Sequence, residues 1–62
     1  MSSEQVNNAN KGTAEDCRDR GSSLLRSGDY AGALKMLDKS LRLFPLPGVD
    51  KLRDQALNGL NF

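Results

Sequence analysis

One stretch, residues 14–45, reads AEDCRDRGSSLLRSGDYAGALKMLDKSLRLFP, with small and apolar residues every three or four positions on both sides of Gly28-Asp29. That spacing is the period of an α-helix with one buried face. Glycine can adopt the left-handed conformation that ends a helix, and aspartate can cap the next one. The stretch therefore predicts two antiparallel helices joined by a very short turn.

The first of these helices is expected over residues 14–27, with Thr13 as its N-cap, and the second over residues 30–44. Gly21 and Ala33 are expected to let the two backbones approach closely, because neither has a bulky side chain. The residues expected to pack the hairpin are small or apolar and recur at helical spacing: Gly21, Leu24, Tyr30, Ala33, Leu37 and Leu41.

The segments on either side of the hairpin differ in character. Residues 1–13 are rich in Asn and Ser and contain little that could be buried, so we expect a disordered arm. Pro45 and Pro47 end the second helix, and a third, shorter helix is expected from about residues 47–49 to Asn58-Gly59. The prediction is an all-α, three-helix bundle over residues 14–62.

Residues 14–45 resemble a tetratricopeptide repeat, a helix-turn-helix unit of about 34 residues. Gly21 and Ala33 match its small positions, Tyr30 the first aromatic position of its second helix, and Pro45 its terminal proline. Arg20 stands where a leucine is usual, which predicts that no preceding repeat packs on that side. The resemblance implies a hairpin closed by a capping third helix, and a scaffold that binds proteins.

Two looser resemblances extend further along the chain. The cysteine-containing first helix, the LRLFPLP junction at residues 41–47 and the short third helix are similar to the N-terminal region of some J-domain co-chaperones. The His-Pro-Asp motif of the J domain is absent, since the chain has no His. The hairpin also resembles that of microtubule-interacting-and-transport domains, whose third helix is longer.

Composition argues against several classes of function. Nine Lys+Arg face eight Asp+Glu, so no strong field favours nucleic acid or an anionic membrane. Without His, and with Cys17 alone, no nucleophile–base pair or zinc ligand set can be assembled. We therefore expect no enzyme, no cofactor and no metal. No apolar run approaches the roughly 20 residues of a membrane span. A cytoplasmic location is expected, or the cytoplasmic face of a membrane if the chain belongs to a longer anchored protein.

Surface charge offers the remaining functional signal. Lys35, Lys39 and Arg42 stand at i, i+4 and i+7 on one side of the second helix, where they could bind an acidic protein or peptide. The alternative is an ordinary solvated face, because Asp38 is expected to pair with Arg42. Arg18 joins the candidates through the resemblance, since peptide-clamping tetratricopeptide co-chaperones carry a lysine at that position of their first helix.

These observations favour a non-enzymatic protein–protein interaction module, the N-terminal domain of a chaperone or J-domain-type co-chaperone. One alternative is a self-associating helical domain that buries surplus apolar surface in a weak homodimer. A peptide-binding module similar to microtubule-interacting-and-transport domains is another.

Overall fold

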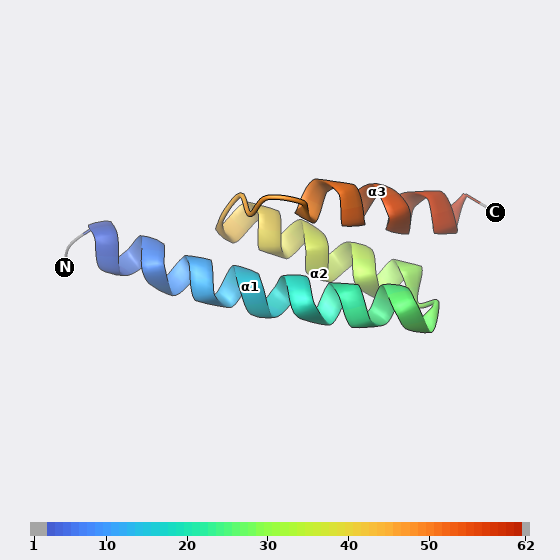
Figure 1. Cartoon of the computed structure of the whole chain (residues 1–62), viewed down its shortest axis with the longest axis horizontal. Coiled ribbons are helices and arrows are strands. Elements are labelled where there is room, and N and C mark those ends of the chain that lie inside the picture. The colour runs from blue at the N-terminus through green and yellow to red at the C-terminus, as the bar shows by residue number, and fades with distance from the viewer. Residues whose placement is uncertain (1–2, 62) are drawn as a thin grey trace.

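The computed structural model describes residues 3–61, and their side chains from Ala9 onward. It contains three helices in the order α1 (Ser3–Ser27), α2 (Tyr30–Leu43) and α3 (Val49–Leu60). α1 and α2 form an antiparallel hairpin, and α3 packs chiefly on α2 (Figure 1). The predicted all-α, three-helix architecture is confirmed. Within the described part of the chain, none of the helices is both long and apolar enough to span a membrane.

The turn between α1 and α2 has the predicted chemistry. Gly28 adopts the left-handed conformation, with φ of 88°. The amide of Asp29 donates to the Leu24 carbonyl at 2.9 Å, and the amide of Gly28 to the Leu25 carbonyl at 3.2 Å, so two carbonyls of the last turn of α1 are satisfied. The Asp29 carboxylate then caps α2 by accepting from the amide of Gly32 at 3.0 Å. The turn thus ends one helix and begins the next.

The close approach of α1 and α2 is also confirmed. A Cβ added to Gly21 would stand 2.7 Å from Cγ of Leu37 and 3.4 Å from the carbonyl oxygen of Ala33. Gly21 is buried, and Ala33 and Leu37 are 0% exposed. The side chain of Leu37 therefore fills the space that a larger residue at position 21 would need.

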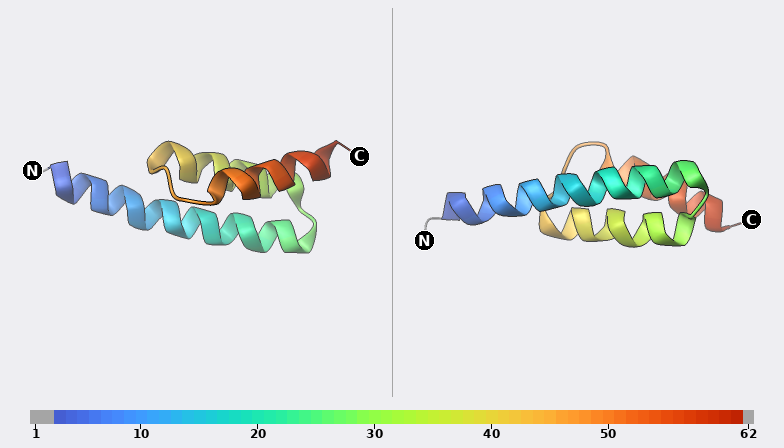
Figure 2. Two further views of the ribbon diagram at one scale, coloured as in Figure 1. Left: turned by 45° about the horizontal axis from the view of Figure 1, so that its top comes forward. Right: turned by 90° about the horizontal axis from the view of Figure 1, so that it is seen from below.

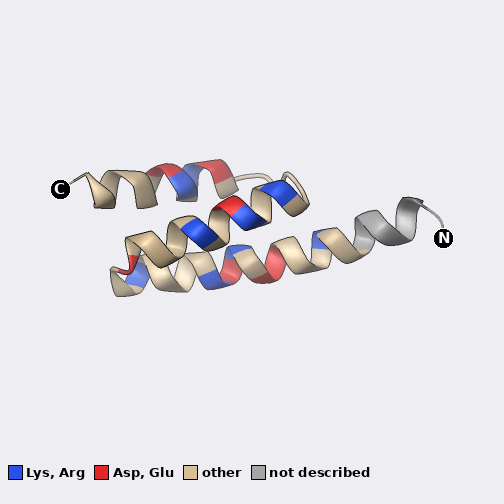
Figure 3. Cartoon of the chain, turned by 180° about the vertical axis from the view of Figure 1, so that it is seen from behind, with Lys and Arg blue, Asp and Glu red and all other residues tan. Residues whose placement is uncertain are grey.

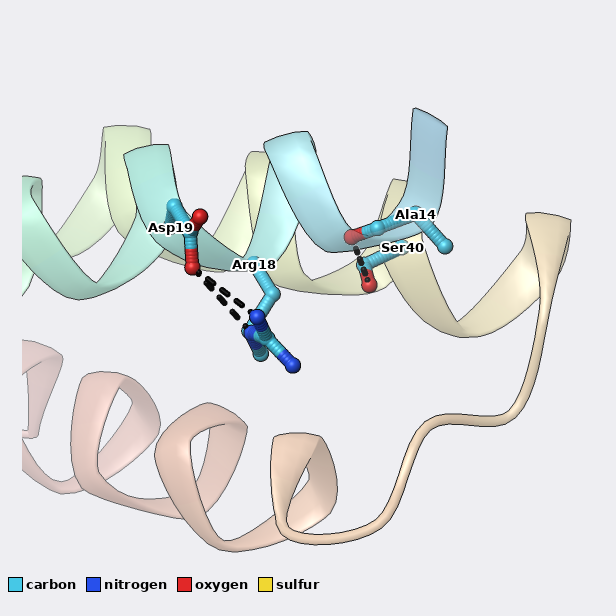
Figure 4. A network of polar contacts seen from close by, with 4 residues as sticks. All are labelled: Ala14, Arg18, Asp19 and Ser40. Atoms are coloured by element: carbon cyan, nitrogen blue, oxygen red, sulfur yellow. Dashed lines mark hydrogen bonds and ion pairs between the residues drawn. The ribbon is translucent and has the colours of Figure 1, made fainter. Parts of the chain in front are cut away.

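A polar contact ties the middle of α1 to the end of α2. The hydroxyl of Ser40 donates to the carbonyl oxygen of Ala14 at 2.7 Å, and both residues are 0% exposed (Figure 4). Among the described side chains, Ser40 carries the one fully buried hydroxyl, and this hydrogen bond satisfies it, since a buried donor without a partner would be costly.

α3 covers the side of α2 that the hairpin leaves open. Its own residues Val49 and Ala56 are fully buried in this contact, and Leu46 of the preceding loop joins the same core. At the edge of this contact, Nε of Arg53 donates to the carboxylate of Asp38. Apolar packing and a flanking ion pair together hold α3 in place.

The first helix begins earlier than predicted. α1 starts at Ser3 rather than at Ala14, and Thr13 is inside it, with its hydroxyl donating to the Ala9 carbonyl at 3.0 Å. Residues 3–13 contain no proline, so a helix nucleated further along can propagate into them at little cost. Lys11 also reaches the hairpin, with its ammonium 6.0 Å from the centroid of the Phe44 ring. Thr13 is therefore not an N-cap.

The division of the chain into an arm over residues 1–13 and a domain over residues 14–62 stays a prediction. The first two residues of the chain, Met1 and Ser2, and the last, Phe62, lie outside the described residues.

Candidate functional site

Three of the four cations predicted to bind a partner lie on the exposed surface of α2. Lys35, Lys39 and Arg42 are solvent-exposed, and their i, i+4, i+7 spacing places them on one side of the helix. Figure 3 shows Lys and Arg positions along α2 in blue. We refer to these three residues as the cationic stripe. Because none of them is buried, each can rearrange to meet a carboxylate without breaking a packed contact.

The structure corrects the ion pair expected beside this stripe. Asp38 does not pair with Arg42 along α2 but accepts from Nε of Arg53 on α3. The spacing of Asp38 and Arg42 allows an intrahelical pair, but a cation from a neighbouring element takes the carboxylate instead. The negative charge of Asp38 is therefore directed toward α3.

Arg18 lies apart from the cationic stripe. Its Nε and Nη2 both donate to Oδ1 of Asp19 at 3.2 Å, and Figure 4 shows the side chain pointing to the side of α1 on which α3 lies. The structure therefore does not bring Arg18 together with Lys35, Lys39 or Arg42.

A groove that the sequence interpretation did not include runs between α1 and α2. Its volume is about 540 Å³. The more buried lining comes from Leu24, Gly32 and Met36, and the exposed edges from charged or polar side chains. We call it the α1–α2 groove, and its lining residues are Asp19, Arg20, Ser23, Leu24, Gly32, Lys35 and Met36.

The α1–α2 groove lies on the side of α2 away from α3. Tyr30 and Asp38 of α2 contact Gly59 and Arg53 of α3, whereas Gly32 and Met36 line the groove from roughly the opposite side of the helix. In the right-hand view of Figure 2, α1 and α2 form a front layer with α3 behind them. The hairpin thus has one face covered by α3 and another that carries the groove.

Gly32 and Arg20 line the groove from its two helices. At position 32, a Cβ would come within 2.6 Å of Oδ2 of Asp29, so the carboxylate that caps α2 fills the space next to this glycine. On the opposite side, Arg20 lines the groove at the position where the resembling family has a leucine. That departure was the one sequence signal for an uncovered side of the hairpin, and the exposed Lys35 is shared by the groove and the cationic stripe.

The packing residues predicted from the sequence are mostly in the core. Leu24 and Leu41 are half-buried against the buried cluster that contains Ala33 and Leu37. Tyr30 is the exception, with 36% of its surface exposed. Its ring lies at the end of the bundle, where it also borders a smaller hollow of about 340 Å³ with Leu25, Arg26 and Gln55.

Gly59 explains the position of Tyr30. A Cβ on Gly59 would overlap the Tyr30 ring, so the absence of a side chain on α3 makes room for the aromatic residue. Gly59 was expected to end the third helix, but α3 continues to Leu60. This glycine permits close packing and does not act as a cap.

Comparisons with protein-family models, with curated proteins and with solved structures found no match. The resemblances to tetratricopeptide repeats, J-domain co-chaperones and microtubule-interacting-and-transport domains therefore remain predictions from the residue pattern. Among the residues that the structure describes, no three His, Cys, Asp or Glu side chains gather as metal ligands.

Proposed function

We propose that the chain is a non-enzymatic protein-interaction module, and that it binds an acidic segment of another protein through the cationic stripe. The observation that supports this most is the pairing of Asp38 with Arg53. Because that carboxylate pairs with a cation of α3, it does not take up Arg42 as its ion-pair partner. Three exposed cations at successive helical positions can then form charge-assisted hydrogen bonds with carboxylates of a partner.

The scale of the expected interaction is modest. Exposed charge pairs contribute about 0.2–1 kcal/mol each, so three of them give selectivity and a fast encounter more than high affinity. A useful complex therefore needs additional apolar contact near the stripe. The resemblance to J-domain co-chaperones adds a second part to the proposal, namely that the module acts together with chaperones. This second part concerns only the identity of the partner.

A photo-crosslinking experiment tests the proposal. A photoreactive amino acid replaces Lys39 in one preparation and Lys51, an exposed residue of α3, in another. We expect a partner crosslinked from position 39 and absent from position 51. The purified partner should then lose affinity for the Lys35→Glu and Lys39→Glu variants but not for Lys51→Glu. Equal affinity for all of these variants, with unchanged helical circular dichroism, would contradict the proposal.

Self-association is the second candidate function. Leu60 is 48% exposed at the end of α3, and the α1–α2 groove adds an apolar surface on the other side of the hairpin. Burying such surface in a homodimer would be favourable. Sedimentation equilibrium at tens to hundreds of micromolar separates the two candidates, since the proposed module stays monomeric without its partner.

A further inference from the structure

The hairpin already holds one helix, and that contact shows what the hairpin requires of a ligand. α3 lies against α2 with Val49 and Ala56 fully buried, and its Arg53 pairs with Asp38 at the edge of the contact. The contact therefore combines an apolar stripe on the incoming helix with a flanking charge opposite to that of the hairpin.

The α1–α2 groove offers the same combination with the charges reversed. Leu24 of α1 and Met36 of α2 supply the apolar lining. Arg20 of α1 and Lys35 of α2 are exposed and stand on the two helices that flank it. The acidic lining residue, Asp19, is engaged by Arg18, which reduces its repulsion of an incoming carboxylate.

From these features we infer that the α1–α2 groove binds an amphipathic, acidic α-helix of a partner protein. Its apolar residues pack on Leu24 and Met36, and its carboxylates on both flanks bond to Arg20 and Lys35. The inference rests on the proposed function, and it specifies the class of segment that the module recognises.

The dimensions of the groove set the length of that segment. Its lining extends over residues 19–24 of α1 and 32–36 of α2. At about 1.5 Å per residue, these spans match one to two turns of a bound helix. Two apolar residues at i and i+4 are enough to cover Leu24 and Met36, and Lys39 lies one turn beyond Lys35 to extend the charged edge.

Synthetic helical peptides of one length test this inference. The probe is a fluorescent, end-capped peptide of about four turns with leucines at i, i+4 and i+7 and glutamates on both flanks. A second peptide has glutamine in place of every glutamate, and a third has lysine. By fluorescence anisotropy at low ionic strength, we expect the glutamate peptide to bind about tenfold more tightly than the glutamine peptide, with no binding of the lysine peptide.

Variants of the protein locate the binding site. Arg20→Glu and Lys35→Glu are each expected to weaken binding of the glutamate peptide by about tenfold, and the matched reversal Lys51→Glu on α3 to leave it unchanged. Ser23→Trp places a large side chain in the groove from an exposed position and should abolish binding. The matched control Asn58→Trp, also exposed, should not.

Several outcomes of these measurements would contradict binding of an acidic helix in the groove. Equal binding of the glutamate and glutamine peptides, or full binding by Ser23→Trp, would overturn the inference. If the chain alone sediments as a dimer and Ser23→Trp as a monomer, the groove belongs to a second copy and the inference is also wrong. A partner that is crosslinked at position 39 and binds Ser23→Trp with undiminished affinity would remove this inference while leaving the proposed function intact.

Discussion

Leu37 of α2 occupies the space that a side chain at Gly21 of α1 would need. Two carbons of Leu37 lie 2.7 Å from the position of a Cβ on Gly21, and Leu37 is completely buried. The register of the hairpin therefore depends on a glycine in the middle of a long helix, even though glycine is unfavourable there by about 1 kcal/mol relative to alanine.

Gly21→Ala is expected to destabilise the protein by about 1–3 kcal/mol, because the overlap with Leu37 outweighs the gain in helix propensity. Gly12→Ala is the matched control in the same helix. A Cβ there meets nothing within 4 Å, so this variant should be stabilised by up to about 1 kcal/mol. Thermal unfolding followed by circular dichroism measures both. Two shifts of the same sign would contradict the packing described here.

Ser40→Ala removes the hydrogen bond from the buried hydroxyl to the carbonyl of Ala14. We expect a loss of about 0.5–1.5 kcal/mol in the free energy of unfolding, measured by urea denaturation. Ser23→Ala, at an exposed position of α1, should change stability by less than about 0.5 kcal/mol. If the two variants unfold at the same urea concentration, the contact between Ser40 and Ala14 does not stabilise the hairpin.

Asp38 should be energetically coupled to Arg53 and not to Arg42. Both members of the Asp38–Arg53 pair are more than a third exposed, so the coupling is expected to be below about 1 kcal/mol and to decrease with added salt. Double-mutant cycles built from Asp38→Ala with Arg53→Ala, and from Asp38→Ala with Arg42→Ala, measure it. A larger coupling energy in the second cycle would contradict this prediction and would favour the intrahelical pair between Asp38 and Arg42.

Gly59→Ala should destabilise the protein less than Gly21→Ala does. The added methyl group meets the ring of Tyr30, which is partly exposed and can move away, whereas Leu37 is enclosed. In a Tyr30→Ala background, the Gly59→Ala change should become neutral or stabilising. A cost that persists without the ring would point to a different neighbour at this position.

The hairpin could be predicted from the sequence because its determinants are local or periodic. Gly28 and Asp29 carry the turn chemistry, and the small residues Gly21 and Ala33 mark where two helices can meet. Each of these signals is read from residue type and spacing alone. The structure agrees with all four.

The start of α1 could not be predicted in this way. Thr13 has the right side chain for an N-cap, but the same hydroxyl can bond to a carbonyl one turn earlier when it lies inside a helix, as it does with Ala9. Local propensity does not distinguish these two outcomes. The pairing of Asp38 with Arg53 escaped prediction for a related reason, since it depends on how α3 is placed across α2.

The α1–α2 groove was only partly foreseeable. Arg20, in place of an expected leucine, indicated a side of the hairpin without a neighbour. That Lys35 and Met36 line the groove together with Arg20 depends on how α2 packs against α1, and the sequence alone does not give that arrangement. The cationic stripe and the groove therefore share Lys35, and only the packing of the helices shows that the two surfaces adjoin.

The burial of Cys17, in the middle of α1, gives the molecule an internal reporter. It is the single sulfhydryl of the chain, so any reaction with a thiol reagent such as an aromatic disulfide comes from one place. Reaction requires the packing around this part of α1 to open, at least transiently, and its rate under native conditions then measures how often it does so. Occupancy of the neighbouring groove by a ligand that bridges the two helices should slow this chemistry without any label being added to the binding surface.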